Sequence, residues 1–293
     1  MGGANAGIGV NRGLVLVLTG LLAACSPLRA FNALVPQDRA GRLVEQGAAF
    51  GAHPRQKVDV YRPTGWRAGA APLPVIVFIY GGSWQDGERG GYGFAARAFA
   101  DRGFLVAVPD YRLVPEVRFP AFVEDGAAGV RWVRANAARL GGDPERIVLV
   151  GHSAGAYNAA MLALDERWLG TDRQAIVGFA GLAGPYDFLP LDAPASIAAF
   201  GQARDLPATQ PINFASAGDP PSLLLHGTAD TTVFPRNSER LAARLRSAGV
   251  EAELKLYPRI GHVGIVTALA RPFRGRASVL EDVVAFARRV TVR

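Results

Sequence analysis

The sequence predicts an α/β protein whose mostly parallel central sheet is covered by helices on both faces. Two apolar runs rich in β-branched residues, at residues 75–80 and 147–150, are typical of strands buried on both sides. Segments with helical spacing alternate with such runs along the chain, and this alternation favours parallel strands joined by helical crossovers. We therefore expect a single α/β domain.

The elements can be assigned in order from Lys57 onward. Strands are expected over residues 57–61, 75–80, 104–108, 147–150, 176–182, 222–225 and 251–257. Helices are expected over residues 94–101, 122–140, 154–164, 238–248 and 278–289. A proline-containing stretch, residues 188–221, interrupts the alternation and predicts a small cap excursion over the sheet edge. No long linker divides the chain, so residues 57–293 are expected to form one catalytic domain.

The N-terminal segment predicts export and a lipid anchor. Arg12 precedes an uncharged run over residues 13–24, which is too short to span a bilayer but has the length of a signal-peptide core. Small residues stand directly before Cys25, the only cysteine in the chain, in an arrangement that resembles a bacterial lipobox. We therefore expect a lipoprotein-type signal peptide over residues 1–25 that ends at a lipidated Cys25. Residues 26–56 are expected to form a tether and lead-in.

Such an anchor would hold the protein at a membrane surface without spanning the bilayer. The expected location is a bacterial cell envelope, on the periplasmic or outer face of a membrane. An ordinary secretory signal with an incidental cysteine is the alternative. A lone cysteine also excludes an internal disulfide framework.

The charge composition does not predict a nucleic-acid partner. The formal net charge is +7, but the 32 basic residues are dispersed along the chain. No basic run alternates with stacking aromatic residues, as binding to single-stranded nucleic acid would require. The sequence shows neither the ligand spacing of a metal site nor the glycine pattern of a nucleotide site, so no cofactor and no metal are expected.

The strongest chemical signal is a Gly-His-Ser-Ala-Gly motif centred on Ser153. It follows the strand over residues 147–150 directly and opens the helix over residues 154–164, which is the context of a nucleophile elbow. Gly151 and Gly155 have no Cβ and so relieve the crowding of this tight turn. Ser153 is therefore the predicted nucleophile, held at the start of a helix.

A serine needs a base to activate it, and the base needs an acid to orient it. In folds with this elbow the acid and then the histidine follow the serine along the chain. Asp230 lies just past the carboxyl end of a predicted strand, at the edge where open α/β sheets bind ligands. His262 lies in a loop after the next predicted strand. We predict Asp230 as the acid and His262 as the base.

The glycine-rich segment after the strand at residues 75–80 predicts an oxyanion hole. Backbone N–H groups on such a loop can come close enough to stabilise the oxyanion of a tetrahedral intermediate. We expect the N–H of Gly82 or Ser83 to act with the N–H of Ala154, the residue after the nucleophile.

Other polar residues are interpreted as structural. His226 is expected to hold the strand-end turn, and His152 is expected to pack within the elbow. Asp187 follows another predicted strand and is the main rival to Asp230 as the catalytic acid. Residues 110–112, Asp-Tyr-Arg, are expected to pin a loop by hydrogen bonds and a salt bridge.

Taken together, these motifs resemble the α/β-hydrolase family, in its carboxylesterase branch near the hormone-sensitive-lipase-like and BD-FAE-type enzymes. The resemblance begins at about Lys57 and rests on the motifs at residues 81–84, 110–112, 142–144, 151–155, 226–230 and 261–262. It implies an α/β-hydrolase fold. One departure is that Tyr80 stands before the two glycines where the family usually has histidine.

The function that follows is cleavage of small or medium acyl esters by two-step acyl transfer. Related enzymes include kynurenine formamidases and prenylcysteine methylesterases, so the sequence leaves an amidase, formamidase or peptidase on the same triad open. A non-catalytic envelope binding protein that keeps the fold is an alternative of another class. Trp84 and Phe188 are interpreted either as walls of an apolar substrate pocket or as ordinary core.

Overall fold

The structure, a computed structural model, describes residues 27–292. The expected signal peptide over residues 1–25, with Cys25, lies outside the described residues. The described chain forms an eight-stranded sheet in the order β1-β2-β4-β3-β5-β6-β7-β8. The strands are β1 (Gly41–Ala49), β2 (Lys57–Pro63), β3 (Leu73–Ile79), β4 (Leu105–Pro109), β5 (Gly142–His152), β6 (Ile176–Leu182), β7 (Ser222–Gly227) and β8 (Ala252–Tyr257).

The sheet is mostly parallel, as predicted. Strands β3 to β8 pair in parallel, whereas β2 pairs antiparallel with both β1 and β4. All five residues of β4 are buried, and so are the last six of β5. Strands of this kind need a helix layer on each face, because neither face can be left to water.

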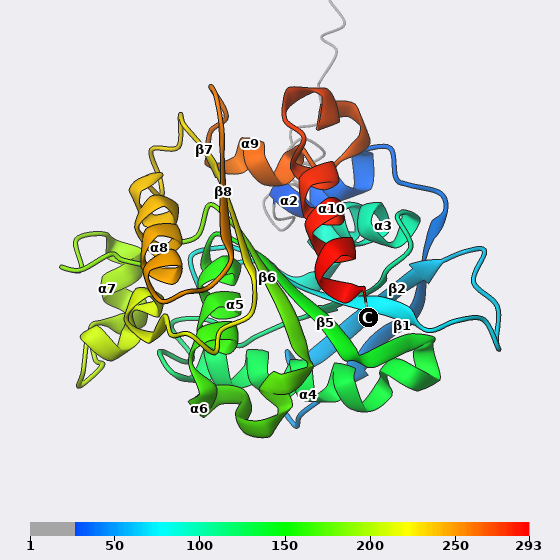
Figure 1. Ribbon diagram of the computed structural model, residues 1–293, viewed down its shortest axis with the longest axis horizontal. Helices are drawn as coiled ribbons and strands as arrows, with labels where there is room; N and C mark the ends of the chain where they lie inside the picture. The colour runs from blue at the N-terminus through cyan, green and yellow to red at the C-terminus, as the bar shows by residue number, and fades with distance from the viewer. Residues whose placement is uncertain (1–26, 293) are drawn as a thin grey trace, which may run out of the picture.

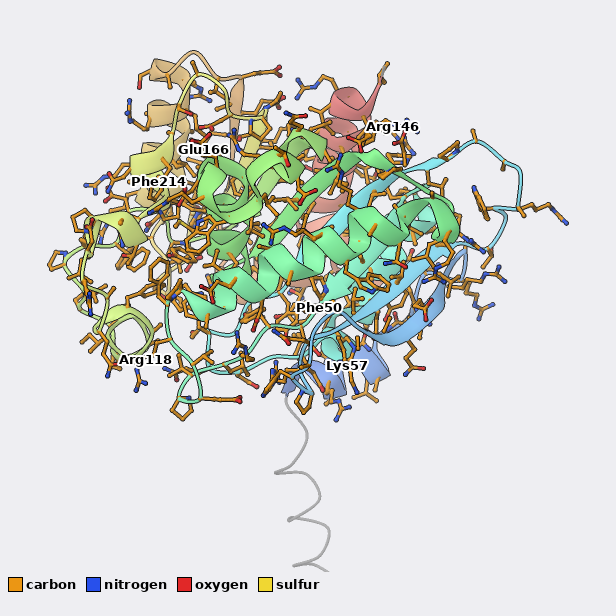
Figure 2. All side chains as sticks on the ribbon, turned by 90° about the horizontal axis from the view of Figure 1, so that it is seen from below. Phe50, Lys57, Arg118, Arg146, Glu166 and Phe214 are labelled. Carbon is orange, nitrogen blue, oxygen red and sulfur yellow. The ribbon has the colours of Figure 1, made fainter. Side chains whose placement is uncertain are left out.

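Helices supply both layers. They are α2 (Pro27–Leu34), α3 (Gly93–Asp101), α4 (Ala121–Leu140), α5 (Ala154–Leu164), α6 (Glu166–Leu169), α7 (Pro194–Phe200), α8 (Arg236–Ser247), α9 (His262–Thr267) and α10 (Val279–Thr291). Helices α3 and α10 cover one face of the sheet (Figure 1), and α4 and α5 cover the other, which faces the viewer in Figure 2. The α/β-hydrolase architecture is therefore confirmed.

The local sequence explains how the longest helix ends. Gly141 follows α4 with a φ of 93°, in the left-handed region that glycine adopts without strain. Its N–H caps the carbonyl groups of Ala137 and Ala138. The chain then enters β5 at once, so this glycine leads directly to the strand that carries the predicted nucleophile.

The segment between β6 and β7 forms the expected small cap. It contains α7 and two short 3₁₀ turns, at Pro207–Thr209 and Pro211–Phe214. Figure 1 shows α7 at the edge of the molecule beside α8. The cap also covers α5, whose Tyr157 hydroxyl donates to the carbonyl of Thr209 at 2.8 Å. All residues of α5 are buried between the sheet and the cap, which explains why apolar residues lie on all its sides.

Two expectations about local structure are wrong. Residues 26–56 are not merely a tether and lead-in, because β1 lies within them and pairs with β2 at the sheet edge. Register shifts at Leu43/Glu45 and Glu45/Ala48 break the apolar–polar alternation that would have revealed the strand. His262 does not lie in a loop but is the first residue of the short helix α9.

None of the helices between Pro27 and Val292 has the length and apolar character needed to span a bilayer.

Candidate active site

Ser153 lies at a sharp turn between β5 and α5. Its φ is 54° and its ψ is −124°, a conformation that is strained for any residue with a side chain. The turn leaves no room for a Cβ on the flanking glycines. A Cβ on Gly155 would lie 2.1 Å from the carbonyl oxygen of Ile79, and one on Gly151 would lie 2.4 Å from the carbonyl oxygen of Gly155. The motif therefore requires glycine at both positions, because backbone atoms of β3 and α5 lie too close to the elbow to leave room for a Cβ.

The three residues predicted as nucleophile, base and acid lie together in one hydrogen-bonded chain. The Ser153 hydroxyl lies 2.8 Å from Nε2 of His262. On the other side of the ring, Nδ1 of His262 lies 2.7 Å from Oδ2 of Asp230. The three residues follow β5, β7 and β8, whose carboxyl ends share one edge of the sheet. This edge is where open α/β sheets bind ligands.

The surroundings of Asp230 favour its ionised form. Its other oxygen, Oδ1, accepts hydrogen bonds from the N–H groups of Thr232 and Val233, each at 2.9 Å. Burial raises the pKa of Asp230, but the hydrogen bonds from His226, His262 and the Val233 N–H outweigh burial and hold the pKa below its ordinary value. A carboxylate is therefore available to orient His262 and to stabilise its protonated form.

His152 supports the site from the elbow. Its Nε2–H donates to the backbone carbonyl of His262 at 3.1 Å, and the two ring centroids lie 5.1 Å apart. Burial, together with the nearby His262, lowers the pKa of His152 to about 3. The ring is therefore neutral, and it contacts the base through the backbone, in line with the packing role expected for it.

The expected oxyanion segment adopts an unusual backbone. Gly82, Ser83 and Trp84 have φ values of 134°, 55° and 58° in succession. Ser83 and Ala154 line the same cavity as Ser153, whereas Gly82 does not. Within residues 27–292, no hydrogen bond uses the backbone N–H of Ser83 or of Ala154. Two free N–H groups thus lie beside the nucleophile, and Ser83 fits the expected role better than Gly82.

Tyr80 takes the place of the family's usual histidine beneath this segment. Its ring is stacked between Tyr92 and Tyr111, with centroid distances of 5.2 and 4.9 Å. Its hydroxyl donates to Asp110 at 2.7 Å and accepts from Arg55 at 3.0 Å. Burial, with the adjacent Asp110, raises the pKa of Tyr80 well above its ordinary value, so the phenol stays protonated.

Charged residues connect the loop after β3 with the loop after β4. Arg55 also donates to the carbonyl of Gly87 at 2.7 Å, and Asp110 forms an ion pair with Arg89. Arg112 donates to both oxygens of the buried Asp125, at 2.8 Å each. The loop-pinning role predicted for residues 110–112 is confirmed.

A cavity of about 380 Å³ opens from Ser153 between the cap and the start of α8. Most of its wall is apolar, formed by Trp84, Pro185, Phe188, Leu189, Pro190, Ala193, Ala195, Val233 and Phe234. Both interpretations of Trp84 hold, since it lines the cavity and also packs edge-on against Phe200 at 4.8 Å. Asp187 does not reach His262 but pairs with Arg240 at 2.8 Å on the cavity wall. The rival acid is therefore placed outside the hydrogen-bonded chain.

Two features of the site were missed from the sequence. Arg236 and Arg240 of α8 line the cavity. The predicted helix began at residue 238 and so left out Arg236, and nothing in it distinguished Arg240 from surface residues. His226 contacts the Asp230 carboxylate as well as holding its turn, with Nε2 3.3 Å from Oδ2. The four-residue spacing of these two side chains was the only sequence signal for this contact. Within residues 27–292, no group of His, Cys, Asp and Glu side chains is arranged to hold a metal ion.

The fold is that of an α/β hydrolase, and the relatives of the chain include members of the carboxylesterase branch of that family. The chain belongs to the BD-FAE family, whose model matches residues 58–245. The matched region includes the oxyanion segment, the elbow and Asp230, and it ends before His262.

Several relatives of the chain are named as esterases. A probable isoprenylcysteine alpha-carbonyl methylesterase of Oryza sativa subsp. japonica is 32% identical over 272 residues, which cover 82% of this chain and 61% of that protein. A carboxylesterase of Mycobacterium tuberculosis is 34% identical over 228 residues, which cover 70% of this chain and 71% of that protein. The chain spans about three fifths of the length of the first curated relatives it matches.

Solved structures share the fold. Esterase B of Lactobacillus rhamnosis, in a structure with a tributyrin phosphonate inhibitor, superimposes with a TM-score of 0.79 at 20% identity. That match covers 96% of this chain and 97% of the esterase.

Proposed function

We propose that this protein hydrolyses carboxylic esters through a Ser153–His262–Asp230 triad and an acyl-enzyme intermediate. The observation that carries the proposal is the unbroken hydrogen-bonded chain from the Ser153 hydroxyl through both ring nitrogens of His262 to Asp230, at 2.8 and 2.7 Å. Those distances match the direct contacts that proton transfer requires.

The mechanism proceeds in two halves. His262 removes the proton from Ser153 as the serine oxygen attacks the ester carbonyl carbon, and Asp230 stabilises the imidazolium that forms. His262 then returns the proton to the leaving alcohol as the bond between the carbonyl carbon and the alcohol oxygen breaks. Water, deprotonated by His262, then attacks the acyl carbon of the acyl-enzyme. The bond between that carbon and the Ser153 oxygen breaks, His262 returns the proton to the serine oxygen, and the carboxylic acid is released.

The tetrahedral intermediate of each half carries a negative charge on the former carbonyl oxygen. The unpaired N–H groups of Ser83 and Ala154 are the proposed donors to that oxygen. The contacts of Arg55 with Tyr80 and the Gly87 carbonyl hold the chain on both sides of Ser83. The turn from β5 into α5 holds Ala154, so both proposed donors are in place before substrate arrives.

The cavity supports a substrate with a small or medium apolar group. Its walls are mostly aliphatic and aromatic, and it reaches the Ser153 hydroxyl. Ester-cleaving relatives, and the tributyrin phosphonate in the esterase B structure, are consistent with substrates of this kind.

The location of the enzyme is proposed from the sequence of its N-terminus. We propose that Cys25 carries a lipid and holds the enzyme at a bacterial envelope membrane. Metabolic labelling with an alkyne fatty acid in a bacterial host is expected to label the wild-type chain but not Cys25→Ala. Equal labelling of both chains would contradict the anchor.

Hydrolysis of p-nitrophenyl acetate and p-nitrophenyl butyrate tests the proposed activity. Replacing Ser153, Asp230 or His262 by alanine is expected to reduce kcat by several orders of magnitude. Ser247→Ala is the matched control, because this serine lies exposed at the end of α8 and, among residues 27–292, its hydroxyl bonds only the Arg244 carbonyl. A wild-type chain that cleaves neither ester, and does not react with a fluorophosphonate, would favour the binding-protein alternative. Cleavage of anilides but not esters would favour the amidase alternative.

A further inference from the structure

A second histidine contacts the carboxylate of Asp230. His226 lies near the end of β7, and its side chain is fully buried. Its Nε2 lies 2.8 Å from the carbonyl oxygen of Val233 and 3.3 Å from Oδ2 of Asp230. Its Nδ1 lies 2.7 Å from the hydroxyl of Ser238 on α8.

These contacts fix the position of the ring proton. The carbonyl oxygen of Val233 can only accept a hydrogen bond, so Nε2 of His226 must carry the hydrogen. A neutral ring then has a lone pair on Nδ1, which accepts the hydrogen bond from the Ser238 hydroxyl. The Nε2–H is consequently shared between the Val233 carbonyl and Asp230.

Both histidines donate to the same carboxylate oxygen. Oδ2 of Asp230 accepts from Nδ1 of His262 at 2.7 Å and lies 3.3 Å from Nε2 of His226. Oδ1 is occupied by the N–H groups of Thr232 and Val233. Four donors therefore surround the carboxylate, and His226 is the only side chain among the described residues that competes with His262 for it.

We propose that His226 is a positioning residue that sets the basicity of His262 through Asp230. The inference rests on the proposed function, in which Asp230 orients the base. By donating to Oδ2, His226 fixes the direction of that oxygen and takes up part of its negative charge. The remaining charge is what stabilises the protonated form of His262.

Loss of the His226 donor has a defined electrostatic consequence. Without that donor, more of the negative charge on Asp230 acts on His262. This favours the imidazolium form of His262 and raises its pKa. The active form of a general base is the neutral ring, so the acid limb of kcat/KM moves to higher pH.

Few titratable side chains among the described residues contact His262 or Asp230. The described groups in contact with His262 are Ser153 and His152 from the elbow and Asp230 from the loop after β7. His226 is the remaining titratable group in contact with Asp230. His152 is neutral above a pH of about 3, because burial beside His262 lowers its pKa to that value, so it does not titrate in the same range.

Two substitutions distinguish the hydrogen bonds made by the two ring nitrogens of His226. His226→Gln places an amide N–H near the position of Nε2 and keeps a donor for Asp230. His226→Asn keeps an acceptor for Ser238 near the position of Nδ1 but loses the donor. A purely structural role predicts similar effects of both variants, whereas the proposal predicts that only the asparagine variant alters His262.

The chain contains only four histidines, so ¹⁵N–¹H imidazole spectra can follow His262 directly. In His226→Asn we expect the His262 titration and the acid limb of kcat/KM to move upward by about half to one pH unit. In His226→Gln both should stay within about 0.2 unit of wild type. Equal shifts in the two variants, no shift in His226→Asn, or a downward shift overturns the proposal.

The wild-type spectrum gives a test that does not depend on how the variants fold. His226 should keep its proton on Nε2, and its Nε2–H resonance should move as His262 titrates, because both rings bind one oxygen. A His226 resonance that is unchanged through the His262 titration overturns the proposal. This result is distinct from a failure of the proposed function, which would appear as absent turnover in a chain whose His226 and His262 resonances are still coupled.

Discussion

Replacement of Asp230 by asparagine should trap His262 in the wrong tautomer. The N–H groups of Thr232 and Val233 point at Oδ1, so the amide of asparagine must place its oxygen there. Its NH₂ group then lies where Oδ2 was, facing Nδ1 of His262 at 2.7 Å. The Nε2–H of His226, 3.3 Å from the same position, keeps the Val233 carbonyl as its acceptor. Two donors cannot face one another, so the ring proton moves to Nε2 and Nδ1 becomes the acceptor.

The size of the defect follows from this geometry. With a proton on Nε2, His262 cannot accept the proton of Ser153, although the 2.8 Å spacing of those atoms is kept. A tautomer fault of this kind costs about 10⁴ in kcat, and a loss of that size corresponds to about 5 kcal/mol of barrier. Substrate still meets an unaltered cavity, so KM should change little.

Steady-state hydrolysis of p-nitrophenyl butyrate measures both constants. Asp172→Asn is the matched control, because this carboxylate binds Arg131 and Arg134 on the surface near α4. Thermal unfolding of each variant checks that the fold is kept. A kcat for Asp230→Asn within tenfold of wild type would refute the reasoning about the tautomer.

Three further predictions concern the framework of the site. Burial lowers the pKa of His152 to about 3 in the folded chain, whereas an unfolded histidine has a pKa of about 6.5. Between these two pH values the unfolded chain therefore binds a proton at His152 that the folded chain does not bind. The free energy of unfolding should therefore decrease by up to about 1.4 kcal/mol per pH unit between those values, and His152→Gln should flatten this slope in urea titrations. Tyr80→Phe removes the hydroxyl that is bonded to Asp110 and Arg55, while Asp110 keeps its ion pair with Arg89. The free energy of unfolding should fall by about 1–2 kcal/mol. An unchanged melting temperature in thermal unfolding would contradict this prediction. Gly155→Ala places a Cβ 2.1 Å from the Ile79 carbonyl and should abolish fluorophosphonate labelling, whereas Gly65→Ala, which meets no atom within 4 Å, should label as wild type does.

The sequence was sufficient to predict seven of the eight strands and the triad, because these depend largely on local patterns. Buried parallel strands appear as apolar runs, and the elbow is confined to residues 151–155 between a strand and a helix. Once Ser153 was placed, chain order and the sheet edge restricted the acid and the base to a few side chains. The structure brings Asp230 and His262 to Ser153 as expected.

Contacts between distant segments could not be predicted in the same way. Arg55 reaches Tyr80 and the Gly87 carbonyl from the connection before β2, and no local pattern reports such a contact. Strand β1 was missed because its register shifts disturb the period of two on which strand prediction depends. The role of His226 was only partly predicted, since its contact with Asp230 depends on how the loop after β7 folds back.

Rapid quenching of the reaction with p-nitrophenyl butyrate, followed by mass spectrometry of the digested chain, tests the central claim most directly. We predict a butyryl group on the peptide that contains Ser153, formed at the rate of the p-nitrophenol burst and absent from Ser153→Ala. Turnover without any acyl group on that peptide, or with the acyl group on another residue, would contradict the proposed acyl-enzyme mechanism.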